Sequence, residues 1–233
     1  MGQAAGRRVA LLDFDLQFGT CGIYLDLAGQ ASLADLIASP ERLDRSLLQG
    51  AMTRHKSGLD VLLAPAAIMP MDSVSPEFAG ACIEIARQSY DVVIVDLPCV
   101  WTGWSYEVLQ RSDLLMLVTQ LSVASVRHTG RQMETLRAQG LDSVPLKLVL
   151  NRHEGGWGLG RSAHGKDAEK ALGRPFDHQI ADNYRLVSEA LNRGVGLAAI
   201  ERRSKVERDV EAMFNDVAEK LAASAAKDTA ATV

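Results

Sequence analysis

Short apolar runs alternate along the chain with longer segments whose apolar residues recur every three or four positions. The short runs, rich in aliphatic and β-branched residues, predict strands, and the longer segments predict helices. Because the strand runs are apolar at nearly every position, we expect helices on both faces of one doubly wound, mainly parallel sheet in an α/β fold. The predicted strands span residues 9–13, 59–63, 92–95, 114–118, 146–150 and 176–180.

The predicted helices span residues 32–37, 76–88, 122–139, 166–172, 184–192 and 204–223. The last shows the clearest pattern, because its apolar residues form one stripe along the helix. Ser204 and Glu207 have the spacing of a capping box at its start. Between the fifth strand and the fourth helix, residues 153–165 carry five glycines and predict a mobile loop.

The length of 233 residues fits one α/β domain over residues 1–223, followed by a small, polar tail over 224–233 that we expect to be flexible. With 47% hydrophobic and 23% charged residues, the composition is typical of a globular protein. The chain begins without an apolar signal core, which favours a cytoplasmic location. A net charge of −4 gives no overall attraction to nucleic acid, and we expect no direct membrane anchor.

Acidic side chains follow two of the predicted strands directly. The first strand runs into Asp13-Phe14-Asp15, and the third ends in Val95-Asp96. In a doubly wound sheet, ligands bind beyond the carboxyl ends of the strands. Because carboxylates can hold the water shell of Mg²⁺ beside a triphosphate, these residues predict a magnesium and nucleotide site.

Two later strands end in residues suited to a nucleotide base. The fifth strand leads into Asn151-Arg152, and the sixth leads into Asp182. An asparagine amide offers both a donor and an acceptor to the edge of adenine. An aspartate after a strand more often caps a turn than binds a metal. Four suitable strand ends in one chain nevertheless favour a binding site.

The order of these segments resembles the MinD/ParA family of deviant Walker P-loop ATPases, and more closely its CpaE/TadZ pilus-assembly branch. The resemblance rests on residues 7–20, on 95–98 with Trp101 and Trp104, and on 150–152. It implies that Asp13 and Asp96 lie on the magnesium side, with Asp96 as the Walker B aspartate. It further implies that Asp15 orients the attacking water, that Asn151 and Arg152 contact the nucleotide, and that the loop carrying Asp182 closes over the base.

This resemblance implies an ATPase-like spatial regulator that uses ATP and Mg²⁺ and localises or assembles a pilus or secretion apparatus. From the acidic net charge we expect no nucleic acid as a partner. We therefore expect pilus or secretion assembly proteins as partners, a homodimer in the complete form, and recruitment to a cell pole. Two other functions stay open. One is a scaffold that binds pilus-assembly partners without hydrolysing ATP, and the other is a ParA-type ATPase of DNA partition, which the acidic net charge disfavours.

The phosphate-binding loop of the family is expected upstream of Val9, and residues 2–8 resemble the end of the helix that follows this loop. The sequence therefore predicts that the loop segment is missing from this chain. Residues 160–166 imitate the motif G-x-x-x-x-G-K, but Asp167 replaces its hydroxyl residue and no strand directly precedes it. We expect a surface loop there, without a phosphate site.

We expect the 233-residue chain to bind Mg·ATP weakly and not to hydrolyse it. A phosphate-binding loop supplies the backbone N–H groups and the lysine that hold the phosphates. Losing several charge-assisted hydrogen bonds of roughly 1.5–3 kcal/mol each weakens binding by orders of magnitude. Calorimetry with Mg·ATP on this chain, and on one extended upstream, measures the difference. Micromolar binding by the shorter chain would contradict the expectation.

Overall fold

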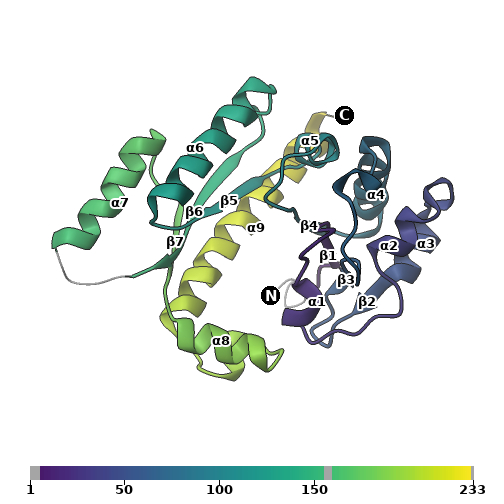
Figure 1. Cartoon of the computed structure of the whole chain (residues 1–233), viewed down its shortest axis with the longest axis horizontal. Coiled ribbons are helices and arrows are strands. Elements are labelled where there is room, and N and C mark those ends of the chain that lie inside the picture. The colour runs from purple at the N-terminus through teal and green to yellow at the C-terminus, as the bar shows by residue number, and fades with distance from the viewer. Residues whose placement is uncertain (1–5, 155–158, 232–233) are drawn as a thin grey trace. The chain divides into compact units, whose positions relative to one another are not determined.

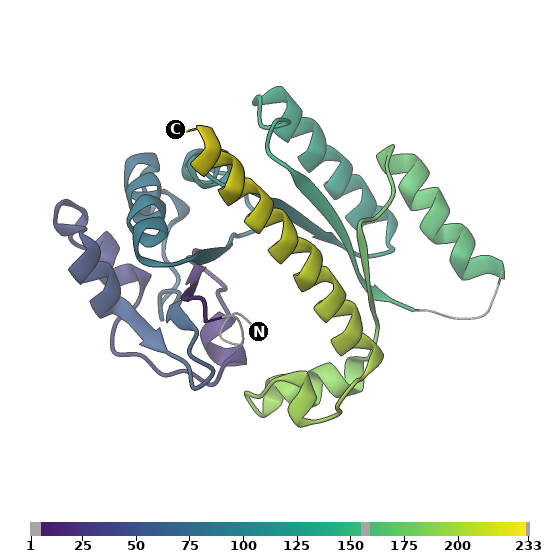
Figure 2. The ribbon, with the colours of Figure 1, turned by 180° about the vertical axis from the view of Figure 1, so that it is seen from behind.

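The computed structural model describes residues 6–154 and 159–231, which form two compact units (Figures 1 and 2). Unit 1 comprises Met1–Arg111 and Leu191–Val195, and unit 2 comprises Ser112–Ala190 and Gly196–Val233. Each unit contains a mainly parallel sheet flanked by helices. The predicted α/β class is confirmed, with two sheets in place of the single sheet that the sequence predicts.

The sheet of unit 1 has the strand order β2-β3-β1-β4. Its strands are β1 (Val9–Asp13), β2 (Met52–Arg54), β3 (Asp60–Leu62) and β4 (Val92–Asp96). Strand β1 pairs in parallel with both β3 and β4, whereas β2 runs antiparallel to β3. Because β1 is central, its carboxyl end lies between those of two parallel neighbours.

The helices of unit 1 are α1 (Cys21–Tyr24), α2 (Leu33–Ile37), α3 (Arg45–Ala51), α4 (Pro76–Ser89) and α5 (Gly103–Gln110). Short 3-10 turns lie at Pro40–Arg42 and Met71–Ser73. The core forms where the apolar side chains of these helices pack on β1 and β3. Its fully buried members include Ala10, Leu12, Phe14, Leu33, Leu36, Leu48, Leu62, Ala79 and Cys82.

The sheet of unit 2 is fully parallel, with the order β5-β6-β7. Its strands are β5 (Leu115–Thr119), β6 (Leu146–His153) and β7 (His178–Ala181). Its helices are α6 (Val123–Ala138), α7 (Leu159–Leu172), α8 (Tyr184–Asn192) and α9 (Lys205–Ala231). A 3-10 turn lies at Leu197–Ala199. Figures 1 and 2 show α6 and α7 on one face of this sheet and α9 on the other. No helix in the described part of the chain is long and apolar enough to cross a membrane.

Successive side chains of β6 pack alternately into two apolar clusters of unit 2, one on each face of the sheet. Leu148 and Leu150 pack with Met133 of α6 and Leu172 of α7, whereas the side chain of Val149 packs in a cluster with residues of α9. This period of two is the pattern of a strand buried on both faces. Helix α9 presents Val206, Val210 and Met213 to this cluster, which confirms the apolar stripe predicted for it.

Strands β4 and β5 carry exposed apolar side chains, so the expectation that they are buried on both faces is wrong. Their continuous apolar runs predict burial on both faces, yet Ile94 is 50% exposed and Val118 is 61% exposed. Among the described strands, β4 pairs only with β1 and β5 pairs only with β6. Both are therefore edge strands of their sheets, and their outer side chains have fewer neighbours to cover them.

Part of the glycine-rich segment is helical, where the sequence predicts a loop. A mobile loop is expected over residues 153–165, but β6 extends to His153 and α7 already begins at Leu159; residues 155–158 lie outside the described part. The buried Ala168 and Leu172 anchor α7 to the core, and the helix extends from them toward its N-terminus. The imitation of a phosphate loop at 160–166 thus lies within a helix. Likewise, α9 continues past Ala223 to Ala231.

A network of charged side chains joins α9 to the sheet of unit 2. The ammonium group of Lys147, on β6, lies 3.3 Å from Asp177 Oδ1 and 2.9 Å from Asp216 Oδ2 of α9. His178 Nε2 lies 2.9 Å from the same Asp216 oxygen. The hydrogen bond to Asp216 raises the pKa of Lys147, and the bonds from Lys147 and His178 lower the pKa of Asp216. The network therefore stabilises the charged forms of both groups.

We expect Lys147→Met to lower the free energy of unfolding by about 1–2 kcal/mol, because Asp177 and Asp216 lose their shared cation and Asp216 is partly exposed. The lowered pKa of Asp216 means that its contribution is present above the ordinary carboxyl pKa and is lost as the pH falls through the lowered value. Urea unfolding at neutral and acidic pH measures both effects. Lys166→Met, at an exposed position of α7, is the control. Equal stability of the two variants at neutral pH would refute the prediction.

Candidate functional site

Asp13 and Asp96 lie side by side at the carboxyl ends of β1 and β4. They are partners in the parallel register of these strands, and the Phe14 backbone N–H donates to the Asp96 carbonyl oxygen at 2.9 Å. Asp13 is completely buried, whereas Asp96 is exposed. The structure thus brings together the two carboxylates that the sequence predicts for a magnesium site.

The Asp13 carboxylate is held by backbone groups of the loop that follows β1. Its Oδ1 accepts from the Asp15 N–H at 3.2 Å, and its Oδ2 accepts from the Cys21 N–H at 3.1 Å. Burial raises the pKa of Asp13, and the nearby Asp96 raises it further, while the two backbone hydrogen bonds oppose this shift. The loop therefore turns back over the strand end and encloses the carboxylate.

Cys21 is a member of this site that the sequence does not predict. Its thiol donates to Asp96 Oδ2 at 3.4 Å, and it is half-buried at the start of α1. Burial, together with the charges of Asp13 and Asp96, raises the pKa of the Cys21 thiol. No spacing motif links this cysteine to either aspartate, so the sequence alone favours a packed free thiol.

Asp15 has a local role in the same loop. Its Oδ1 accepts from the backbone N–H groups of Gln17 at 3.1 Å and of Phe18 at 3.0 Å. This is the turn geometry that aspartate commonly supports. The role in orienting a water molecule, which the resemblance implies, remains a hypothesis for this half-buried carboxyl group.

Gly19 packs directly against the Asp13 carboxylate. A Cβ at this position would lie 2.6 and 2.7 Å from the two Asp13 oxygens and 2.2 Å from the Cβ of Ala64. Real side chains do not approach so closely, and the neighbours here are a buried carboxylate and a short side chain that cannot swing away. The absence of a side chain at Gly19 is thus needed for the present position of Asp13.

Asn151, Arg152 and Asp182 lie together in unit 2, at the carboxyl ends of β6 and β7. A bulge between Leu150 and His153 gives Arg152 a φ of 53°, and its N–H donates to Asn151 Oδ1 at 2.9 Å. The Asp182 N–H donates to the His153 carbonyl at 3.0 Å. The three residues predicted to contact a nucleotide therefore share one edge of one sheet.

The tryptophan pair predicted from the pilus-branch resemblance has a packing role in part. Trp104 is buried, its ring lies 5.9 Å from that of Phe14, and its Nε1 donates to the Met71 carbonyl at 2.8 Å. Trp101 is half-buried. The ring of Trp104 covers the end of β1 from within the core, which leaves it unable to anchor a partner.

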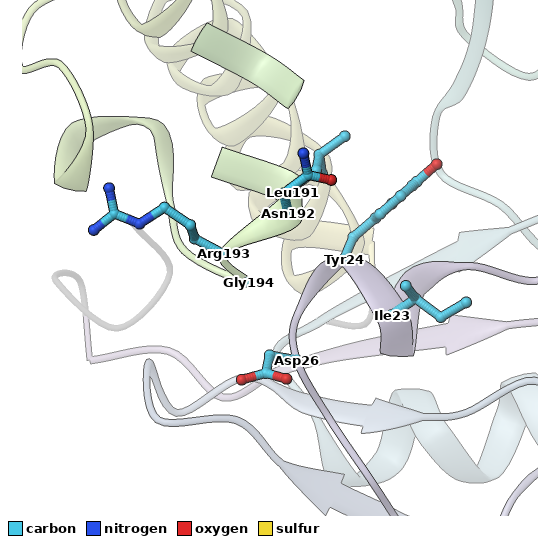
Figure 3. A pocket seen from close by; sticks show the side chains of 7 residues that line it. All are labelled: Ile23, Tyr24, Asp26, Leu191, Asn192, Arg193 and Gly194. Carbon is cyan, nitrogen blue, oxygen red and sulfur yellow. The ribbon is translucent and has the colours of Figure 1, made fainter. Parts of the chain in front are cut away.

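A hollow of about 390 Å³ lies beside α1 (Figure 3). Residues 191–194 line it together with Ile23, Tyr24 and Asp26. Gly194 is buried there, and a Cβ on it would lie 2.2 Å from the Cβ of Asp26. With a single carboxylate and exposed apolar side chains, the hollow has no set of ligands comparable with the group at Asp13.

Comparison with known proteins agrees with this architecture, although no family model matches the sequence. Over 149 residues the chain is 26% identical to the septum site-determining protein MinD of Bacillus subtilis (strain 168). The aligned residues cover 63% of this chain and 54% of MinD. The chain thus spans about half the length of this relative. A ParA family ATPase from Chlorobium tepidum TLS superposes with a TM-score of 0.77 and 26% identity, covering 88% of this chain and 83% of that one.

The chain is thus similar in sequence and in fold to proteins of the MinD/ParA family. MinD from Pyrococcus horikoshii OT3, solved in complex with Mg-ADP, also shares the fold, with a TM-score of 0.69, 17% identity and coverage of 88% and 81% of the two chains. These similarities support the resemblance to the MinD/ParA family that the sequence predicts. The finer prediction of the CpaE/TadZ branch is not tested by these relatives.

We expect Gly19→Ala to lower the stability of the folded chain by about 1–3 kcal/mol, because the added methyl group must displace the Asp13 carboxylate or Ala64. Gly50→Ala is the matched control, since a Cβ at this helical position of α3 meets nothing within 4 Å. The control should be neutral or slightly stabilising. Chemical denaturation of both variants measures the difference, and a Gly19→Ala variant as stable as the control would contradict the packing argument.

Proposed function

We propose that this protein is a nucleotide-dependent spatial regulator of the MinD/ParA type, which localises or assembles a pilus or secretion apparatus. The observation that carries the proposal is the pair Asp13 and Asp96 at adjacent strand ends, in a chain of this family. A carboxylate pair at this place in an α/β sheet suits a cation bound beside phosphate groups. The nucleotide would be ATP, with Mg²⁺ as the cation.

The donor set suits Mg²⁺ in part. Asp13 and Asp96 supply carboxylate oxygens, which hard cations prefer, and they would hold Mg²⁺ largely through its water molecules. Cys21 supplies a thiol, which hard cations do not prefer. When bound, Mg²⁺ would neutralise phosphate charge, and Asp13 and Asp96 would fix its position. Asp15, in the same loop, would orient the attacking water.

The resemblance assigns the contacts with the nucleotide base to Asn151, Arg152 and Asp182. Asn151 offers an amide to an adenine edge, Arg152 offers a guanidinium group from its bulged position, and Asp182 follows the neighbouring strand. The MinD structure that contains Mg-ADP supports the choice of an adenine nucleotide for a chain of this fold. These three roles are part of the proposal.

The pilus-assembly role depends on the sequence after β4. Leu97 and Pro98 follow Asp96 directly and Trp101 lies five positions after it, a pattern that resembles the pilus-assembly branch. A regulator of this type would act as a homodimer, with pilus or secretion assembly proteins as partners and a cell pole as its destination. The burial of Trp104 removes it from the candidate contact residues of this segment, in which Cys99 and Val100 are exposed and Trp101 is half-buried.

Localisation in cells tests the proposal. A fluorescent fusion expressed from the protein's own locus should form foci that coincide with the pilus or secretion apparatus. Asp96→Asn should disperse these foci, because it removes one carboxylate of the pair without changing its size. Glu84→Gln, at an exposed position of α4, removes the same charge from unit 1 and should leave the foci unchanged.

Each other pattern contradicts a defined part of the proposal. Foci that persist in Asp96→Asn would indicate a scaffold that needs no nucleotide cycle. Fluorescence spread over the nucleoid, and lost when DNA is removed from part of the cell, would indicate DNA partition. Foci at the division site would reject the pilus-assembly role and leave a spatial regulator of another process.

A further inference from the structure

The outer faces of α6 and α7, which cover the same side of the sheet of unit 2 (Figures 1 and 2), carry more exposed cations than anions. In the described part of these helices, the exposed cationic side chains are Arg127, Arg131, Arg137, Lys166 and Lys170, and the exposed acidic ones are Glu134 and Asp167. The two helices are in contact, because a Cβ on Gly130 of α6 would lie 3.8 Å from Leu172 Cδ2 of α7. The whole chain carries a net charge of −4, so this face has the opposite sign.

A row of exposed side chains runs along α6. Val123, Arg127 and Arg131 are spaced four residues apart, so they lie on one side of the helix and form what we call the α6 row. Val123 is 80% exposed, and both arginines are exposed. Met133, on the opposite side of α6, is buried against β6. Within the described part of the chain, neither Arg127 nor Arg131 forms an ion pair, so both guanidinium groups are available to a partner.

The charge and the spacing of the α6 row indicate which partner fits it. Arg127 and Arg131 are about 6 Å apart along the helix axis. Carboxylates four residues apart on another helix have the same spacing, so two ion pairs can form at once. An apolar residue of the same segment would cover Val123 and Leu121, which is 37% exposed. We propose that the α6 row, with the cations of α7 beside it, is a docking surface for an acidic amphipathic helix of another protein.

Anionic membranes and nucleic acid fit this face less well than an acidic helix does. A helix that lies on a membrane inserts its apolar side into the lipid, whereas the apolar side of α6 is buried in the core with Met133 and Leu136. DNA presents phosphates at regular intervals, and these would meet Glu134 and Asp167 as well as the cations. A protein segment can place a neutral or basic residue opposite each carboxylate. The net charge of −4 further opposes DNA and anionic lipid.

This docking surface goes beyond the proposed function, because an acidic helix on the α6 row needs neither a nucleotide nor the carboxylate pair Asp13 and Asp96. Localisation in cells and binding of a peptide to the purified chain are separate readouts, and they use different variants. Either one can therefore fail without the other.

Fluorescence anisotropy with synthetic peptides tests the proposal on the whole chain. The probe is a labelled helical peptide with leucine along one side and glutamates spaced four residues apart, and the comparison peptide has glutamine in place of each glutamate. The native chain should bind the glutamate peptide saturably and about tenfold more tightly than the glutamine peptide. Arg127→Glu combined with Arg131→Glu should weaken binding of the glutamate peptide about tenfold or more, because like charges then face each other.

A charge-reversed peptide and a matched variant keep the test decisive. A peptide with lysine in place of each glutamate should bind the chain with Arg127→Glu and Arg131→Glu more tightly than it binds the native chain. Arg42→Glu combined with Arg45→Glu gives the same net charge through exposed residues of unit 1, and it should leave binding of the glutamate peptide unchanged. Far-ultraviolet circular dichroism establishes that each variant is folded.

Four results would each overturn the proposal. The first is equal binding of the glutamate and glutamine peptides by the native chain. The second is unchanged binding of the glutamate peptide after both arginines of the α6 row are reversed in a folded chain. The third is loss of binding in the control with Arg42→Glu and Arg45→Glu. The fourth is tighter binding of a labelled DNA duplex, or of phosphatidylglycerol vesicles, than of the glutamate peptide.

Discussion

The burial of the Asp13 carboxylate is the constraint on which the candidate site depends. A carboxylate without water needs hydrogen-bond donors, and here the N–H groups of Asp15 and Cys21 supply them. The chain between these two residues must therefore turn back over the end of β1, and Gly19 must come close enough to exclude a Cβ. The same turn carries the Cys21 thiol to Asp96. One buried group thus determines the positions of the loop, the glycine and the sulfur.

Much of the fold follows from the apolar runs, because a strand between two layers of helices must be apolar at nearly every position. The six predicted strands are confirmed, and their ends differ from the predicted ones by at most three residues. The sequence misses β2, since Met52–Arg54 is a short edge strand with no apolar run. It also misses α3 and α5, which are short, although Asp44 and Thr102 cap their first turns. These two helices are stabilised by the side-chain caps at their first turns. Over so few residues, hydrophobic periodicity does not reveal a helix.

The residues of the site that lie at strand ends could be predicted from the sequence. Asp13 and Asp96 each close an apolar run, and parallel pairing of neighbouring strands then brings them together. Which strands are neighbours depends on the whole fold, so the contact between Cys21 and Asp96, 75 positions apart, has no local signal. The side-chain bonds of Asp15 likewise follow from the turn it occupies. Sequence reasoning thus found the carboxylates and not the thiol between them.

The thiol of Cys21 affects how the pair Asp13 and Asp96 can bind a cation, because Mg²⁺ and thiophilic cations such as Zn²⁺ interact differently with sulfur. Mg²⁺ keeps most of its water, so it would contact Asp13 and Asp96 mainly through water and leave Cys21 protonated. A thiophilic cation exchanges water for sulfur and oxygen directly, which relieves the charge on the buried Asp13 without a hydrated intermediary. The affinity of the cation for sulfur therefore decides between the two modes. With Mg²⁺ as the proposed cation, Cys21 would therefore stay a protonated hydrogen-bond donor to Asp96 and would not become a ligand.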